Sequence, residues 1–260
     1  MPRSSRTARP PHQAALTIAF VGSVLLAAAR TLRGRGGARA VDILRQADEA
    51  GPRSLGIVAL TCALVGVMLA YMGGAQLARM GAQGLLADVV TVGMLREFGG
   101  LMTGIILAGR VGSAFAAQLA SMTAGEEIDA LRVLGVDPVA HLVLPRLVGL
   151  LLVAPALMAF GVLAGVLASV PAATLSYGLS ASEYLAQSLR ALTFTHFWIG
   201  LGKGMLYALL VGLASCREGL HAGRSAQAVG EATTRAVVKA LVWIVSAACL
   251  TTVVLTILGY

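Results

Sequence analysis

The sequence predicts an all-α integral membrane protein, with an N-terminal interfacial helix followed by five transmembrane helices. Hydrophobic residues make up 57% of the 260 residues and charged residues only 12%, which excludes an ordinary soluble globular domain. Several apolar runs exceed the roughly 20 residues that a helix needs to cross a bilayer core. Much of the positive charge lies before the first long run, a bias typical of a cytoplasmic flank.

Residues 1–53 are expected to form an Arg-rich cytoplasmic N-terminus, and residues 54–260 to form the membrane domain. Residues 14–29 are an apolar run that rises only about 24 Å as a helix, so we assign them to the membrane surface. A cleaved signal peptide is the alternative, because Ala27-Ala28-Ala29 would pass as a cleavage site. The arginines that favour a cytoplasmic N-terminus are Arg3, Arg6, Arg9, Arg30, Arg33, Arg35, Arg39, Arg45 and Arg53.

Five spans are expected, and their bounds follow the apolar runs. They are residues 55–78, 89–119, 139–170, 196–215 and 240–260. Pro145 and Pro155 are expected to bend the third span. The connection 171–195 holds one Arg, one Glu and a short helix near residues 182–190, which fits an outer loop. The stretch 216–239 holds four Lys or Arg residues and fits the cytoplasm, so the C-terminus is expected outside.

A short charged helix is expected between the second and third spans, at residues 123–134. Thr123 and Glu126 have the spacing of a capping box, and Gly135 is placed to end the helix. Because the first span runs outward and the second returns, this helix would lie in the cytoplasm. It would be a rigid handle joined directly to two spans.

Four charged residues lie inside the expected spans, where an isolated charge costs several kcal/mol. They are Arg96, Glu97, Arg110 and Lys203. Arg96 and Glu97 are adjacent and point in different directions on a helix, so they line a polar cavity or mark the outer end of the span. Arg110 lies among small residues such as Gly109 and Gly112, where it would fix close helix packing. The lysine can extend toward the headgroups.

The sequence contains no pattern for an ATP site, a hydrolase or a metal centre, so neither an enzyme nor a resident cofactor is expected. Gly200-Leu201-Gly202-Lys203-Gly204 lacks the spacing of a phosphate loop. The four histidines are scattered, and the three cysteines lack CxxC spacing. Membrane topology explains the net charge of +8, and without aromatic interleaving nucleic acid is not an expected partner.

Residues 97–146 resemble the signature region of the MlaE/YrbE family, the membrane permease subunits of ABC transporters that move lipids with MCE-domain proteins. The resemblance runs through most of residues 53–260. The matching stretches are Leu95-Arg96-Glu97, Leu107-Ala108-Gly109-Arg110-Val111-Gly112-Ser113-Ala114, Glu126-Glu127-Ile128-Asp129-Ala130-Leu131, Gly135-Val136-Asp137-Pro138 and Leu144-Pro145-Arg146. It implies an elbow helix, five spans, a homodimer with a lipid cavity between protomers, and a coupling helix that docks on the ATPase.

Roles for individual residues follow from the charge pattern together with the resemblance. Arg96 and Glu97 are expected to contact the substrate, because charged residues inside an apolar span indicate a polar cavity for a lipid headgroup. The residues expected to couple to the ATPase are Thr123, Glu126, Glu127, Asp129 and Arg132. The residues expected to have a structural, helix-packing role are Gly109, Arg110, Gly112, Pro138 and Pro145. The implied partners are a separate ABC ATPase that binds ATP and Mg²⁺, a periplasmic MCE-domain protein, membrane lipid and, optionally, a small STAS-type cytoplasmic subunit, all at a bacterial inner membrane.

Four positions depart from the family pattern: Gly100 where Pro is frequent, Gln118 where Glu is common, and Gly125 and Glu127 where Thr and Gln are common. Gln118 in particular removes a possible carboxylate partner for Arg110. Two other functions stay open from the sequence, namely an ATP-independent channel or scaffold, and an intramembrane enzyme. The sequence does not distinguish phospholipid from sterol, nor import from export.

Overall fold

The computed structural model describes residues 13–33 and 39–259, which are almost entirely helical and contain no strand. Five helical segments in this part of the chain are long and apolar enough to cross a membrane: Ala40–Arg79, Gln83–Ala124, Val139–Tyr177, Phe194–Leu220 and Ala226–Ile257. The predicted all-α membrane fold with five spans is therefore confirmed. Residues 1–12, 34–38 and 260 lie outside the described residues, and with them Arg3, Arg6, Arg9 and Arg35 of the expected N-terminus.

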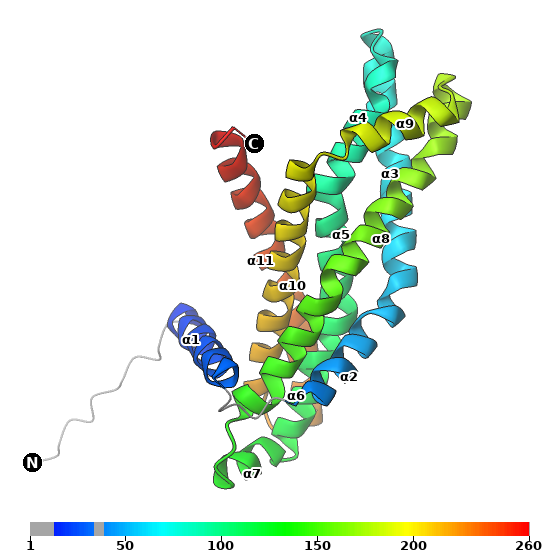
Figure 1. Cartoon of the computed structure of the whole chain (residues 1–260). Helices are drawn as coiled ribbons and strands as arrows, with labels where there is room; N and C mark the ends of the chain where they lie inside the picture. The colour runs from blue at the N-terminus through cyan, green and yellow to red at the C-terminus, as the bar shows by residue number, and fades with distance from the viewer. Residues whose placement is uncertain (1–12, 34–38, 260) are drawn as a thin grey trace, which may run out of the picture.

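The spans form an elongated bundle with α7 (Glu127–Val133) at one end and α9 (Ala181–Ala191) at the other (Figure 1). We call these the α7 end and the α9 end. Helix α3 (Pro52–Arg79) packs along α8 (Leu144–Tyr177), while α10 (Phe194–Leu220) lies between α8 and α11 (Ala226–Ile257). The central position of α10 explains its buried side chains, such as Tyr207.

The second span is a composite helix that widens at two places. It runs through η1 (Gln83–Leu85), α4 (Leu86–Gly93), η2 (Met94–Phe98), α5 (Gly99–Leu107), η3 (Ala108–Gly112) and α6 (Ser113–Ala124). In η2 and η3 the backbone bonds reach five residues, from Gly99 N–H to the Met94 carbonyl and from Ser113 N–H to the Ala108 carbonyl. Such π-helical turns are frequent at functional sites. Here they hold Arg96, Glu97 and Arg110.

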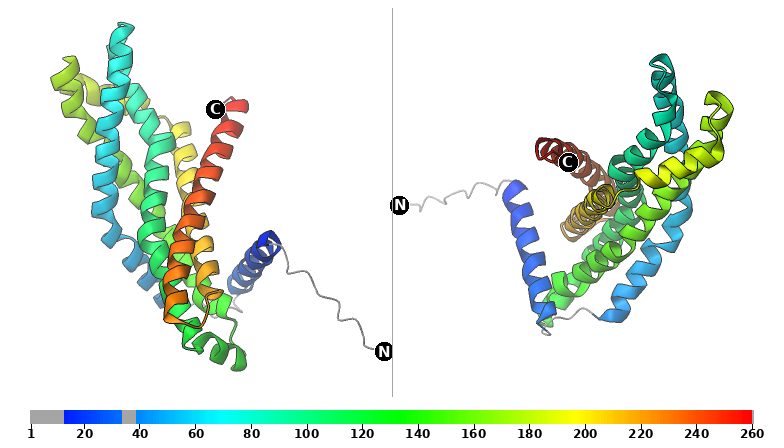
Figure 2. Two further views of the ribbon diagram at one scale, coloured as in Figure 1. Left: turned by 180° about the vertical axis from the view of Figure 1, so that it is seen from behind. Right: turned by 45° about the horizontal axis from the view of Figure 1, so that its top comes forward.

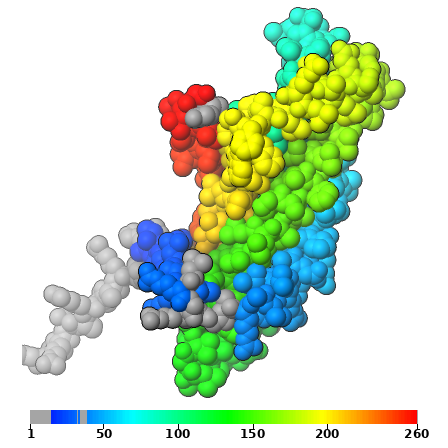
Figure 3. All heavy atoms as spheres, viewed as in Figure 1, coloured from blue at the N-terminus to red at the C-terminus, as the bar shows by residue number. Residues whose placement is uncertain are grey.

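Two helices precede the first span. Helix α1 (Gln13–Leu32) covers the run expected at the membrane surface, and it projects sideways from the α7 end of the bundle (Figures 2 and 3). Phe20, Val24 and Ala27 are its buried residues, packed toward η4 (Val139–Val143), α8 and α10. Helix α2 (Ala40–Ala50) is not predicted by the sequence pattern, because its 11 residues are too few for a span and mix apolar with charged side chains. It crosses α8, where Gly149 leaves room for its backbone.

The structure corrects three of the expected boundaries. The third span ends at Tyr177 rather than at residue 170, because Pro171 lies inside α8 without ending it. Residues 216–239 are not a loop: α10 continues to Leu220 and α11 begins at Ala226. The connection expected at residues 171–195 shortens to residues 178–193, and its short helix is α9, which is anchored by the buried Tyr184 hydroxyl 2.8 Å from Ser169 Oγ.

The capping box is also wrong. Thr123 belongs to the last turn of α6, and its hydroxyl donates to the Leu119 carbonyl at 2.8 Å. Helix α7 starts only after Glu126, whose φ of +60° places it in the left-handed region at a sharp turn. The charged helix is therefore Glu127–Val133, shorter than expected. Its end is as predicted, since Gly135 adopts a φ of +76° just after it.

Candidate functional site

A buried ion pair joins the second, fourth and fifth spans. The ammonium of Lys203 on α10 donates to Glu97 Oε1 on η2, and to the hydroxyl of Thr252 on α11 at 3.0 Å. The Thr252 oxygen also lies 3.1 Å from Glu97 Oε2 and 2.8 Å from the Ala248 carbonyl, either of which can accept its single proton. We call Glu97, Lys203 and Thr252 the span cluster.

The two charges of the span cluster are unequally buried. Lys203 is 4% exposed, so it does not extend to the headgroups as the sequence suggested. The side chain of Glu97 is 32% exposed, and its neighbour Arg96 is half-buried. The cluster lies toward the α9 end, since Lys203 is nine residues from the start of α10, or about 14 Å along the axis. A carboxylate thus reaches a surface of the protomer with a sequestered cation behind it.

Close helix packing explains how Lys203 reaches Glu97. Gly200 and Gly204 are four residues apart on one face of α10, and a Cβ at Gly200 would overlap the Leu95 carbonyl. At Gly100 a Cβ would lie 3.4 Å from the Cα of Gly204, so the backbones of α5 and α10 nearly touch. Small residues four apart are the usual means of such an approach in membranes. The glycine-rich stretch is therefore a helix-packing surface.

Neither charge of this pair is easily removed on its own. Removing one partner of a buried ion pair leaves an uncompensated charge, which typically costs about 3–5 kcal/mol. Lys203 is the member of the span cluster whose contacts the sequence analysis did not anticipate. The signal that could have found it is a small-xxx-small pattern with a lysine inside an apolar span.

The predicted packing residues fall into different surroundings. Arg110 Nη1 donates to Ser54 Oγ at 2.5 Å and so joins η3 to α3. Gly112 lies close to α10, where a Cβ would come within 2.6 Å of Ser215 Oγ. Gly109 is exposed, and within the described residues no atom lies within 4 Å of the place that a Cβ would take there. Pro138 and Pro145 are buried on either side of the π-helical turn η4.

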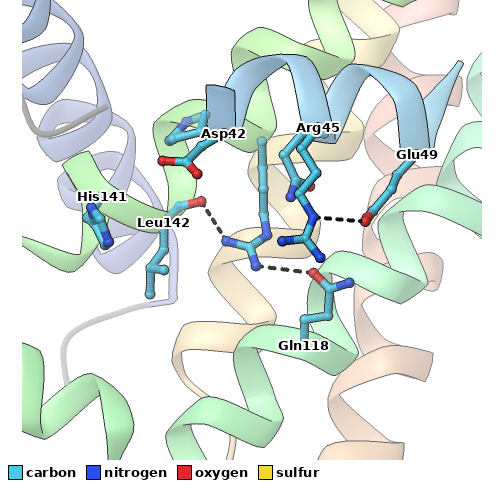
Figure 4. A pocket seen from close by; sticks show the side chains of 9 residues that line it. Asp42, Arg45, Glu49, Gln118, His141 and Leu142 are labelled. Atoms are coloured by element: carbon cyan, nitrogen blue, oxygen red, sulfur yellow. Dashed lines mark hydrogen bonds and ion pairs between the residues drawn. The ribbon is translucent and has the colours of Figure 1, made fainter. Parts of the chain in front are cut away.

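Gln118 is engaged by a different arginine from the one considered above. Its Oε1 accepts from Arg146 Nη2 at 3.1 Å, while Arg146 Nη1 donates to the Leu142 carbonyl at 2.7 Å. These groups border a cavity of about 290 Å³ between α2, α6 and the start of the third span. Figure 4 shows Gln118 facing Arg45 and Glu49 of α2 across it. Arg146, which is 8% exposed, thus ties α6 to the third span.

The residues expected to couple to an ATPase gather at the α7 end, but not as one uniform surface. Arg224, in the turn between α10 and α11, pairs with Glu126 at 3.2 Å and Asp129 at 2.8 Å. Arg132 pairs with Asp129 at 3.0 Å, and every side chain in this set is at least 45% exposed. We call Glu126, Asp129, Arg132 and Arg224 the α7 cluster. Glu127 is exposed beside it, whereas Thr123 bonds inside α6.

Comparison with known proteins decides the family. Residues 43–254 match the family model described as Permease MlaE. The chain belongs to this family. A probable ABC transporter permease protein of Rickettsia typhi is 33% identical over 78% of each chain. One of Pyropia yezoensis is 31% identical over 77% of this chain and 76% of its own.

A third similar protein comes from a plant. The chloroplast protein TRIGALACTOSYLDIACYLGLYCEROL 1 of Arabidopsis thaliana is 34% identical over 77% of this chain and 57% of its own length. The match to ABC transporter permeases identifies a multi-pass transporter permease rather than an enzyme. The resemblance read from the signature stretches is thereby confirmed at the level of the family.

Proposed function

We propose that this MlaE-family permease moves a phospholipid or related membrane lipid between a bacterial inner membrane and a periplasmic MCE-domain protein. It would act as a homodimer driven by a separate ATPase, which binds the ATP and Mg²⁺, with a STAS-type subunit as an optional addition. The observation that carries this proposal is the span cluster, a group of charged residues inside an apolar helix bundle. The chain also belongs to a family of ABC transporter permeases. The name of the Arabidopsis relative contains a galactolipid, which supports a lipid cargo.

The span cluster has the chemistry to handle a headgroup that carries both charges. Glu97 reaches the protomer surface and can accept from an ammonium or hydroxyl, while Arg96 on the same turn supplies a cation for phosphate. The ammonium of Lys203 lies directly behind this carboxylate and offsets its charge inside the apolar bundle. In this proposal the lipid sits between two protomers against η2, where its headgroup meets the fixed charges of the span cluster.

The α7 end supplies a contact surface for an energy-supplying partner. Its charged residues are exposed, and so are two apolar side chains at the end of α7, Val133 at 88% and Leu134 at 76%. An exposed apolar pair rimmed by charges is typical of a protein interface. We place this end in the cytoplasm with the N-terminus and the α9 end in the periplasm, in keeping with the distribution of Arg and Lys.

The first experiment is purification of the tagged protein from native membranes in mild detergent, with mass spectrometry of the retained proteins and lipids. We expect an ABC ATPase, an MCE-domain protein and a phospholipid. Recovery without an ATPase would overturn the proposal in favour of a channel or scaffold.

A second experiment asks whether the span cluster acts on lipid or only holds helices together. In the double variant Glu97→Lys and Lys203→Glu the ion pair is retained in reverse, so the protein should still fold as a homodimer. Lipid transfer by the reconstituted complex should fall at least about tenfold, because the field presented to the headgroup is inverted. If the folded double variant transferred lipid at the wild-type rate, the span cluster would have only a structural role.

A further inference from the structure

A second cavity opens at the α7 end between α1, α10 and α11, far along the bundle from the span cluster. Its volume is about 710 Å³. Its polar part comes from the end of α10 and from residues 234–239 of α11, with Arg217, Glu218, Arg235 and Lys239 as the charged residues. Its apolar part is formed by Leu16, Val238, Val242 and Trp243. The cavity thus has charged side chains at its base and apolar side chains along its wall.

The charged part of this cavity is built around one carboxylate. Glu218, which is 8% exposed, pairs with Arg217 at 2.7 Å and Lys239 at 2.5 Å, and Arg235 Nε lies 3.6 Å away. Arg235 also pairs with the exposed Glu231 at 3.1 Å. Three cations therefore meet two carboxylates, which leaves one formal positive charge. This net charge of +1 favours a ligand that carries a single anionic group.

The apolar part of the cavity continues along the surface of the fifth span. Val238, Val242 and Val245 recur at helical spacing on α11 and are each more than half exposed. On the opposite side, α1 brings Leu16 to the cavity as a wall that is not part of the bundle proper (Figure 2). A lipid whose charged headgroup binds the charged part of the cavity could therefore place an acyl chain along α11, beside α1.

We propose that this cavity binds the phosphodiester headgroup of an anionic membrane lipid, with an acyl chain along α11. Arg235 and Lys239 would contact the phosphate, because they are the more exposed of the three cations. Arg217, which is 6% exposed, would hold Glu218 in place below them. The site goes beyond the transport function proposed above, since it concerns binding at the opposite end of the bundle by the permease itself.

Tryptophan fluorescence can test this site directly. The chain has two tryptophans, Trp243 in the cavity wall and Trp198 at the start of α10. A Trp198→Phe protein in nanodiscs therefore reports on Trp243 alone. The probe is phosphatidylglycerol with brominated acyl chains, titrated into phosphatidylcholine nanodiscs, and brominated phosphatidylcholine is the neutral-headgroup comparison. We expect half-maximal quenching at an about fivefold lower mole fraction for the anionic lipid.

Variants decide whether the cavity causes that preference. Arg235→Gln removes a half-exposed cation with little risk to the fold, and Lys239→Gln removes the second. Each should raise the mole fraction needed for quenching by about fivefold for the anionic lipid and leave the neutral lipid unchanged. Arg39→Gln is the matched control, because it removes an exposed cation that does not line the cavity.

Three outcomes would overturn the proposal. The first is equal quenching by both lipids, and the second is an Arg39→Gln effect as large as that of Arg235→Gln. The third is displacement of the brominated lipid by millimolar inorganic phosphate, which would indicate a site for a free anion. Because the assay contains no ATPase, none of these outcomes bears on the transport proposal.

Discussion

The span cluster and the α7 cluster use the same chemistry in opposite surroundings. In the span cluster a 4% exposed lysine faces a carboxylate across two helices. In the α7 cluster Arg224 pairs with the carboxylates of Glu126 and Asp129, and every side chain of the cluster is at least 45% exposed. Exposed pairs contribute about 0–1 kcal/mol, because water and salt compete for both charges. The span cluster therefore holds one geometry, whereas the charges of the α7 cluster are accessible to the charges of another subunit.

The largest effect is expected from separating the buried pair. Lys203→Met leaves Glu97 without its cation, and we expect the free energy of unfolding in mixed micelles to fall by about 3 kcal/mol. Adding Glu97→Gln removes the orphan charge and should bring the loss back to within about 1 kcal/mol of wild type. Arg224→Ala is the exposed counterpart and should cost less than about 1 kcal/mol. A similar loss for Lys203→Met and Arg224→Ala would remove the distinction between the clusters.

The next effect concerns the packing that brings Lys203 to Glu97. Gly200→Ala places a methyl group against the Leu95 carbonyl and should cost about 1–3 kcal/mol of unfolding free energy. Gly202→Ala is the control, since nothing lies within 4 Å of a Cβ there and alanine favours a helix. Denaturant titration of both variants gives the comparison. If Gly200→Ala were as stable as Gly202→Ala, the close approach of α10 to η2 would not constrain the cluster.

Charge reversal at the α7 end is expected to change coupling and leave stability nearly intact. Glu126→Lys combined with Glu127→Lys should alter the unfolding free energy by less than about 1 kcal/mol, because both side chains are exposed. Lipid transfer by the reconstituted complex should fall at least about tenfold while the homodimer persists in size-exclusion chromatography. Glu183→Lys, an exposed reversal on α9, should leave transfer unchanged. Wild-type transfer in the double variant would exclude a coupling role.

The smallest effect is expected between the two clusters, at Gln118. Gln118→Glu gives Arg146 a carboxylate in place of an amide oxygen at 3.1 Å, so the unfolding free energy should rise by up to about 1 kcal/mol. Gln118→Leu should lower it instead, because the buried Arg146 Nη2 loses its acceptor. Denaturant titration at low and high salt measures both changes. If Gln118→Leu raised the unfolding free energy instead, the hydrogen bond from Arg146 to Gln118 would contribute nothing to stability.

Much of the architecture can be predicted from the sequence because spans need long apolar runs. The first span is expected at residues 55–78 and is found within Pro52–Arg79. Helix α2 is not predicted because its 11 residues mix apolar and charged side chains and form no long apolar run. The predicted start of α7 is wrong because Thr123 can equally bond back within α6, and the local pattern does not decide between the two.

Hydropathy and charge bias by themselves determined that this chain is a five-span helical membrane protein, and the signature stretches identified its family. The reason is that a bilayer core imposes length and polarity on each span separately. Only the tertiary structure decided which charges meet. Glu97 lies 106 residues from Lys203 and 155 from Thr252, and their contact depends on π-helical turns and on glycines that let two helices approach. No local pattern encodes such a contact, because packing among distant spans produces it.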